Sequence, residues 1–309
     1  DFISFASFVS FFPQIVAGPI ERASNLLPQI LNKREFKPEQ IMQGLRLILW
    51  GMFKKVVVAD SLAWRVDYCF DNYLTLDGGT LLLGLIYFSI QIYCDFSGYS
   101  DIAIGTAKLF GIELMSNFKF PYFSRDIAEF WRRWHISLST WLKDYLYISL
   151  GGNRKGSIRT YINLMITMLL GGLWHGASWN FIFWGLWHGI GLSVHRLLDS
   201  RIVLPKLFYQ GFFNIFRKSA NIFFTLLFVN IGWIFFRSED FKTAFIFIER
   251  IFSFSPGYAF YNPFAISLVV LFILYHIILF NNTSFKNIFN LEKDRYLTPI
   301  ILFTMIFLI

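Results

Sequence analysis

A charge-free run from Thr160 to His195 contains the stretch GGLWHGASWN (residues 171–180), with His175 at its centre. The run has about 36 residues and would form a continuous helix of roughly 54 Å, whereas the hydrocarbon core of a bilayer is about 30 Å thick. Glycine costs about 1 kcal/mol in a helix interior, and Ser and Asn favour helix ends, so we predict a break at the glycines and at residues 178–180. The run is then a hairpin of two segments of about 18 residues each, with His175 near its turn.

His175 is a titratable group at the depth where lipid or protein core is expected. Such a group is costly and usually faces a bundle interior or a wet cavity. Non-helical backbone at that depth is tolerated only where it is buried in protein or lines a cavity. The break that the sequence predicts therefore also predicts a cavity beside His175.

The composition is that of a polytopic membrane protein. The chain is 55% hydrophobic and 16% charged, with a mean hydropathy of +0.51, whereas a soluble domain is about 45–50% apolar and about 25% charged. Several apolar segments exclude a soluble enzyme with one anchor, so we expect an all-α transmembrane bundle with re-entrant and interfacial helices. We expect one membrane domain over residues 1–309, truncated at both ends. The net charge of +8 arises in short loops beside apolar spans, which fits the positive-inside rule better than nucleic-acid binding.

The remaining apolar segments predict the other helices of the bundle. We expect helices or spans over residues 40–63, 80–104, 220–236 and 263–280, with a basic connection over residues 196–218. Residues 126–150 mix charged side chains with apolar ones at helical spacing and predict one amphipathic helix, at the membrane interface or inside the bundle. This helix carries His135, and its Glu129 can pair with Arg132 and Arg133.

The two histidines each allow a catalytic and a structural interpretation. A neutral imidazole at position 175 can take a proton from a hydroxyl as that oxygen attacks an acyl carbonyl. Alternatively, His175 donates a hydrogen bond to a carbonyl freed by the helix break. His135 can bind the donor or acceptor, or orient His175, but an aromatic and basic interfacial helix is also common without catalysis.

Other polar residues give weaker signals. Asp95 and Asp101 can line a polar cavity, pair with Lys or Arg, or mark the exit of their helix, and the last is favoured because carboxylates at span ends cost little. His188 and His195 share a helix face but lack a carboxylate or cysteine to complete a metal site. The chain has no Gly-x-Ser-x-Gly motif, so serine hydrolase chemistry has no local support.

Three long motifs carry a family resemblance: YCDFSGYSDIAIG (93–105), NFKFPYFSRDIAEFWRRWHISLSTWLKDYLYISLGGNR (117–154) and GGLWHGASWNFIFWGLWHG (171–189). Together with SFFPQIVAGPIER (10–22), they resemble the membrane-bound O-acyltransferase family in its bacterial alginate O-acetyltransferase branch. The resemblance implies a multi-helix bundle with funnels from both faces meeting near two histidines. His175 matches the principal catalytic histidine, and His135 matches a second functional one. Further candidates for the substrate cavity are Trp174, Asp95, Asp101 and Asn117.

The resemblance also implies an activity and its partners. We expect a multi-pass protein of the bacterial inner membrane that O-acetylates an exopolysaccharide such as alginate, or another cell-envelope glycan. The acyl donor would be acetyl-CoA or a carrier-bound thioester, with no tightly bound cofactor and no metal. The expected partners are the bilayer, the glycan and an extracytoplasmic acetyltransferase protein. D-alanyl transfer to teichoic acid is an enzymatic alternative, and a transporter with its substrate or proton site at the central break is an alternative of another class.

Overall fold

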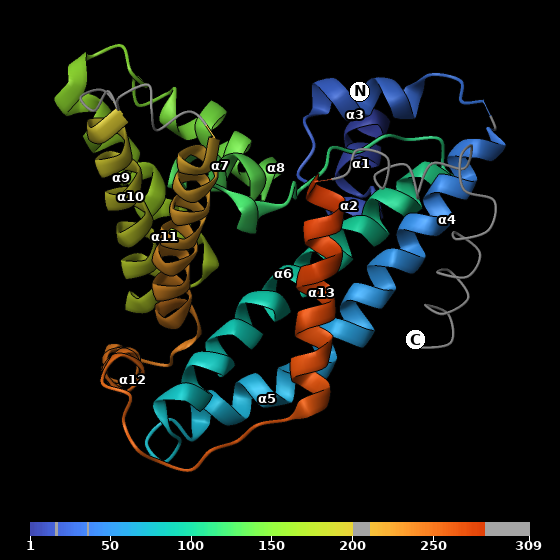
Figure 1. The fold of residues 1–309 in the computed structure, drawn as a ribbon. Helices are drawn as coiled ribbons and strands as arrows, with labels where there is room; N and C mark the ends of the chain where they lie inside the picture. Colours follow the sequence, from blue (N-terminus) through green and yellow to red (C-terminus); the bar gives the residue numbers. More distant parts are fainter. Residues whose placement is uncertain (16–17, 36, 200–210, 282–309) are drawn as a thin grey trace. The chain divides into compact units, whose positions relative to one another are not determined.

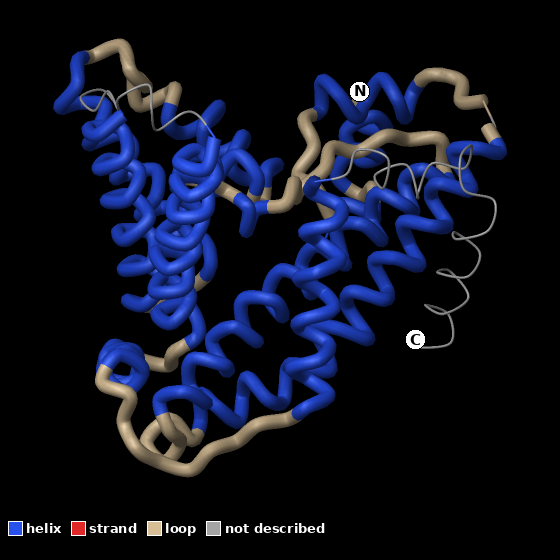
Figure 2. Tube along the Cα trace, viewed as in Figure 1, coloured by secondary structure: helices blue, strands red, loops and turns tan. Residues whose placement is uncertain are grey.

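The computed structural model describes residues 1–15, 18–35, 37–199 and 211–281, and throughout these ranges the regular elements are helices (Figure 2). The expected all-α fold is therefore confirmed. The end of the predicted basic connection lies in α11, whereas its residues 200–210 lie outside the described part of the chain.

The chain forms two compact units. Unit 1 comprises the described parts of residues 1–67, 87–117 and 261–309, and unit 2 comprises those of residues 68–86 and 118–260. Helices α5 and α6 contribute to both units. The expectation that residues 1–309 form a single membrane domain stays a prediction.

Unit 1 contains the amino-terminal helices and α13. Its elements are α1 (Phe2–Val9), α2 (Phe12–Ile15), α3 (Ala23–Leu31), α4 (Pro38–Met52), a π-helical segment (Phe53–Ala59), most of α5 (Asp60–Asp71), most of α6 (Gly78–Leu109) and α13 (Pro263–Asn281). Ring contacts join α13 to α4 between Tyr275 and Trp50 at 5.0 Å, and to α6 between His276 and Tyr93 at 5.6 Å.

Unit 2 contains the motifs around both histidines. Its elements are a 3-10 turn (Pro121–Phe123), α7 (Ile127–Arg133), α8 (Ile136–Trp141), a π-helical segment (Leu142–Tyr147), α9 (Gly156–His175), α10 (Trp179–Asp199), α11 (Gly211–Arg237) and α12 (Phe241–Phe252). Helices α9, α10 and α11 lie side by side, with α10 contacting both of its neighbours (Figure 1).

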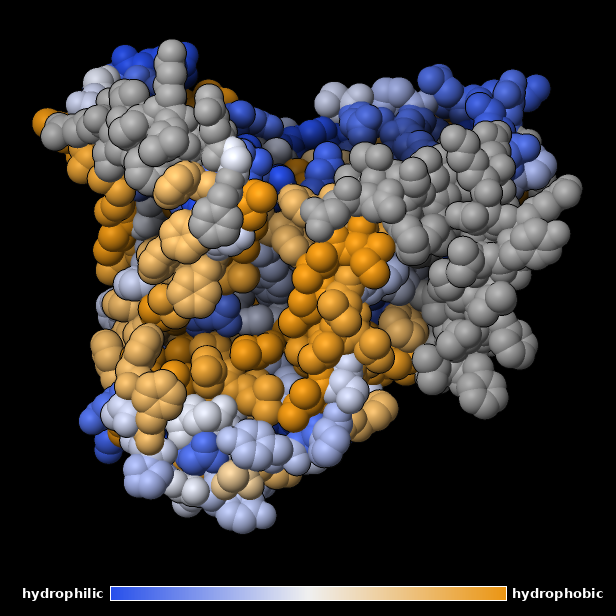
Figure 3. Space-filling view, viewed as in Figure 1, coloured by the Kyte–Doolittle hydropathy of each residue, from blue (hydrophilic) through white to orange (hydrophobic). Residues whose placement is uncertain are grey.

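Within the described residues, three helices are long and apolar enough to cross a membrane, namely α6, α11 and α13. These match the spans predicted over residues 80–104, 220–236 and 263–280. Helices α9 and α10 have 20 and 21 residues but fall outside this set, because Trp, Gly, Asn and His lower their hydropathy. Apolar side chains cover the visible face of α13 (Figure 3). Among the residues of this helix, Phe264 and Leu271 are 61% and 65% exposed. Such exposure is what a lipid-facing surface requires.

One predicted helix is wrong. Residues 126–150 form α7, α8 and a π-helical segment in place of a single amphipathic helix. The break falls at Trp134 and His135, because His135 adopts the left-handed conformation with φ 43° and ψ 54°. Helical periodicity continues across this point in the sequence, so the pattern of apolar residues could not reveal it.

Candidate active site

His175 is the last residue of α9, and α10 begins at Trp179 after a turn over residues 176–178. The predicted hairpin with His175 near its turn is confirmed. Gly176 has a φ of +157°, and a Cβ on it would lie 2.9 Å from the ring of Phe181. Ser178 caps the start of α10, because its Oγ accepts from the N–H of Asn180 at 3.3 Å. The turn therefore fixes where the helix carrying His175 stops.

Gly171 and Gly172 do not break the helix, which corrects part of the sequence prediction. Both lie within α9 and are buried. A Cβ on Gly172 would lie 2.2 Å from the carbonyl oxygen of Phe181, and one on Gly185 would lie 2.3 Å from that of Met168. These two glycines let the backbones of α9 and α10 approach closely, as small residues do between membrane helices.

Aromatic rings surround the partly buried imidazole of His175. Trp174 lies 5.0 Å away between ring centroids, Trp184 and Phe236 lie 5.1 Å away, and Phe181 lies 6.1 Å away. Trp184 is buried, whereas Trp174 is 59% exposed. The imidazole therefore has an enclosed apolar side and an accessible side.

The structure brings His135 close to His175. The ring of Trp174 lies 6.1 Å from that of His135 and 5.0 Å from that of His175, so it contacts both. His135 is only 5% exposed. Burial, and then the neighbouring His175, lowers the pKa of His135 to about 3, so its imidazole is neutral at pH 7. A left-handed non-glycine residue costs about 1–3 kcal/mol and is often found at functional sites.

Helix α7 leads into His135 and is held by charge-assisted hydrogen bonds. Asp126 caps its start by accepting from the N–H of Glu129 at 2.6 Å. Glu129 in turn accepts from Arg133 at 2.7 Å and from Arg125 at 3.1 Å. The sequence predicted that Glu129 pairs with Arg132 and Arg133. The pairing with Arg133 is confirmed, but the second arginine that donates to Glu129 is Arg125 in place of Arg132. Burial alone would raise the pKa of Glu129, but the hydrogen bonds from Arg125 and the charge on Arg133 outweigh it and hold this pKa below its usual range.

The other candidate residues lie in unit 1. Asp95 and Asp101 occur within α6 in place of marking its exit, because the helix continues to Leu109. Asp95 pairs with Lys55 at 2.6 Å, and Asp101 pairs with Lys54 at 2.7 Å. Pairing, one of the alternatives that the sequence left open, is therefore correct. A role for these aspartates in a cavity beside His175 stays a prediction.

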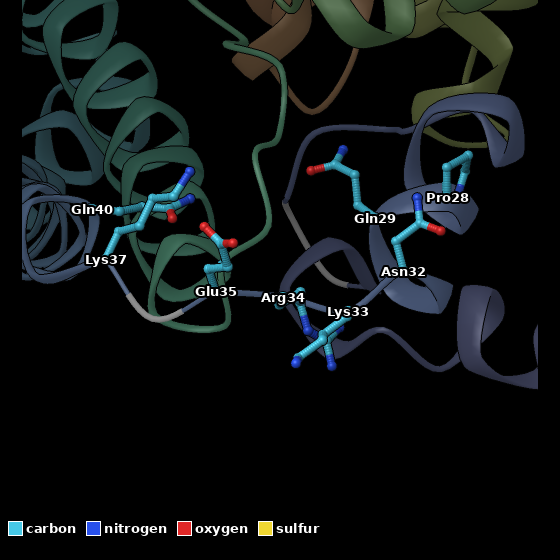
Figure 4. Close-up of a pocket in the computed structure, with 9 residues that line it drawn as sticks. Pro28, Gln29, Asn32, Lys33, Arg34, Glu35, Lys37 and Gln40 are labelled. Atoms are coloured by element: carbon cyan, nitrogen blue, oxygen red, sulfur yellow. The ribbon is translucent and has the colours of Figure 1, made fainter.

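Asn117 is also buried in unit 1, where its amide donates to the hydroxyl of Ser100 at 3.0 Å. Its expected place in the substrate cavity stays a prediction as well. A separate pocket of about 300 Å³ opens in this unit, between the end of α3 and the start of α4 (Figure 4). Its lining includes Lys33, Arg34 and Lys37 but none of the candidate site residues.

Comparison with known proteins identifies the family. The profile of the membrane-bound O-acyltransferase family matches residues 1–237. The chain belongs to this family. The match covers both histidines, the hairpin turn and the whole of α11.

The chain is similar to several named members of the membrane-bound O-acyltransferase family. It is 46% identical to the probable alginate O-acetylase AlgI of Pseudomonas putida over 256 residues, which is 82% of this chain and 50% of that protein. It is 44% identical to the peptidoglycan O-acetyltransferase of Helicobacter pylori, over 79% of this chain and 45% of that protein. The teichoic acid D-alanyltransferase of Streptococcus thermophilus is 31% identical over 62% of this chain and 49% of that protein. The chain spans about half the length of the curated relatives it matches.

Part of the site in this member of the membrane-bound O-acyltransferase family was not predicted from the sequence. Phe236 contacts His175 from the end of α11, 61 positions further along the chain, and no local pattern marks it. His188 was considered only as a metal ligand, yet it is fully buried with its ring 4.8 Å from that of Trp184. The repeated Trp-His-Gly at residues 187–189 was the available signal.

Proposed function

We propose that the chain is the histidine-bearing part of a multi-pass inner-membrane enzyme that O-acetylates a cell-envelope glycan. The observation that carries this proposal is that the ring of Trp174 contacts both His175 and His135, at the turn of an apolar hairpin. The similarity to an alginate O-acetylase and a peptidoglycan O-acetyltransferase supports an acetyl donor and a glycan acceptor.

The proposed reaction is direct acyl transfer with His175 as general base. A nitrogen of the neutral imidazole takes the proton of a glycan hydroxyl as that oxygen attacks the thioester carbonyl. The new C–O bond forms, the C–S bond breaks, and the proton passes from His175 to the leaving thiolate. The aromatic wall of Trp184, Phe181 and Phe236 keeps water away from the reacting carbonyl.

His135 is assigned to binding the donor or the acceptor. Its neutral ring nitrogens offer one donor and one acceptor, which suits a hydroxyl or a carbonyl oxygen. His135 adopts the left-handed backbone conformation, and its imidazole lies next to Trp174.

The donor and partners follow from the same proposal. The acyl group is supplied from the cytoplasm by acetyl-CoA or a carrier-bound thioester, with no tightly bound cofactor. An extracytoplasmic acetyltransferase protein takes part in modifying the exported glycan. The more distant similarity to a teichoic acid D-alanyltransferase keeps D-alanyl transfer as the second candidate, and the family membership favours acyl transfer over transport.

Substitution of His175 in the intact protein tests the proposal. We expect His175→Ala to lower glycan acylation by about 10²- to 10⁴-fold, the usual contribution of a general base. Membrane levels are measured by immunoblot, and the glycan is analysed by mass spectrometry, which separates an acetyl from an alanyl substituent by mass. Normal protein levels with undiminished acylation would refute the role of His175.

A further inference from the structure

A buried hydrogen bond joins the start of α10 to the end of α11. The side-chain amide Nδ2 of Asn180 donates to the backbone carbonyl of Ser238 at 2.6 Å. Asn180 is 4% exposed and Ser238 is 7% exposed. A buried hydrogen bond to a backbone carbonyl is costly to break, because the carbonyl is then left without its partner away from water.

The two ends of this bond carry the rings that enclose His175. Phe181 follows Asn180 directly, and Trp184 lies one helical turn further along α10. Phe236 lies two residues before Ser238 at the end of α11. All three rings contact the imidazole of His175, at 5.1 to 6.1 Å. The bond therefore joins the two helices whose rings contact the imidazole.

We infer that Asn180 is a positioning residue that holds α10 and α11 at the separation required to orient His175. This inference rests on the proposed function, because it assumes that His175 performs the proton transfer. An amide suits the role because it donates without charge. An aspartate of the same shape has no donor and would direct a negative oxygen at the carbonyl of Ser238.

The test compares Asn180 with a second buried asparagine in the same unit. Asn163 is fully buried in α9 and donates to the carbonyl of Gly152 at 3.0 Å, but it lies 12 positions before His175. Asn180→Asp and Asn163→Asp therefore remove equivalent hydrogen bonds, and only the first lies beside the aromatic wall.

The measurements are kcat and KM of the full-length protein in membranes, and the rate at which diethylpyrocarbonate modifies His175, read from its peptide by mass spectrometry. We expect Asn180→Asp to lower kcat at least about tenfold with little change in KM, since small misplacements of a reacting group are costly. We expect the modification rate of His175 to change as well. Asn163→Asp should lower thermal stability but leave kcat and the modification rate near their wild-type values.

A wild-type kcat for Asn180→Asp, or an equal loss of kcat in Asn163→Asp, would overturn the inference. If Asn180→Asp does not accumulate in membranes, Asn180→Ala, which removes the side-chain donor without adding a charge, is compared with Asn163→Ala, and the same results are expected. His175→Ala distinguishes a failure of the proposed function from a failure of the positioning role of Asn180. An active His175→Ala refutes the proposed function, whereas an inactive His175→Ala beside a fully active Asn180 variant refutes only the positioning role.

Discussion

Replacing Gly172 with alanine tests whether close contact between α9 and α10 sets the position of His175. Gly172 lies inside α9, three residues before the histidine. By helix propensity alone, this substitution should stabilise α9 by about 1 kcal/mol. The tertiary structure predicts the opposite result, because the new methyl group would meet the backbone of α10.

The size of the effect follows from the contact distance. The added Cβ would lie 2.2 Å from the carbonyl oxygen of Phe181, about 1.2 Å short of the 3.4 Å at which ordinary van der Waals contact begins. A backbone carbonyl within a helix cannot rotate away, so the two helices must separate. Overpacking of this kind costs about 1–3 kcal/mol. A shift of about 1 Å at a catalytic group can lower the rate by about 10²-fold.

Gly171 is the matched control for this substitution. A Cβ on Gly171 would lie 3.3 Å from Cδ1 of Leu142, the end of a flexible side chain that can move. We expect Gly171→Ala to keep wild-type acylation and to keep or slightly raise thermal stability, because alanine has the higher helix propensity. We expect Gly172→Ala to lower both. Melting is followed by fluorescence in detergent, and acylation by mass spectrometry of the glycan. If the two variants behave alike, close backbone packing does not position His175.

Three further predictions follow from contacts in the two units. Glu129→Gln should lower the free energy of unfolding by about 1–3 kcal/mol at neutral pH, since two arginines lose a charged acceptor. Because the pKa of Glu129 is depressed, its contribution is present above the usual glutamate pKa and is lost as the pH falls through the depressed value. Melts from pH 7 to pH 3 should therefore show the variant and wild type converging, and a constant gap would contradict this assignment. Lys54→Met should destabilise unit 1 by about 3–5 kcal/mol by leaving Asp101 without its buried partner, and Lys54→Met combined with Asp101→Leu should recover most of that loss in chemical denaturation. Phe236→Ala should open the wall beside His175, so the ratio of kcat/KM for butyryl over acetyl thioesters should rise, and an unchanged ratio would show that this ring does not limit acyl length.

Local features of the sequence determined the helices and the hairpin. A charge-free run that is too long for one span required a turn. His175 was placed beside that turn by comparing the length of the run as a helix with the thickness of the bilayer. The spans of α6, α11 and α13 followed from apolar composition in the same way. These predictions held because they depend on residues that are neighbours in the chain.

Only the tertiary structure decided which side chains surround His175. Phe236 comes from α11, and His135 faces Trp174 because of one left-handed residue in a segment whose apolar pattern remains helical. The close approach of Gly172 to the carbonyl of Phe181 likewise depends on how α9 meets α10. An apolar pattern predicts that a helix face is buried. It does not predict which side chains pack against that face, since many partners satisfy the same hydrophobic requirement. Sequence therefore placed the catalytic candidate at a turn, and packing between distant segments decided which groups surround it.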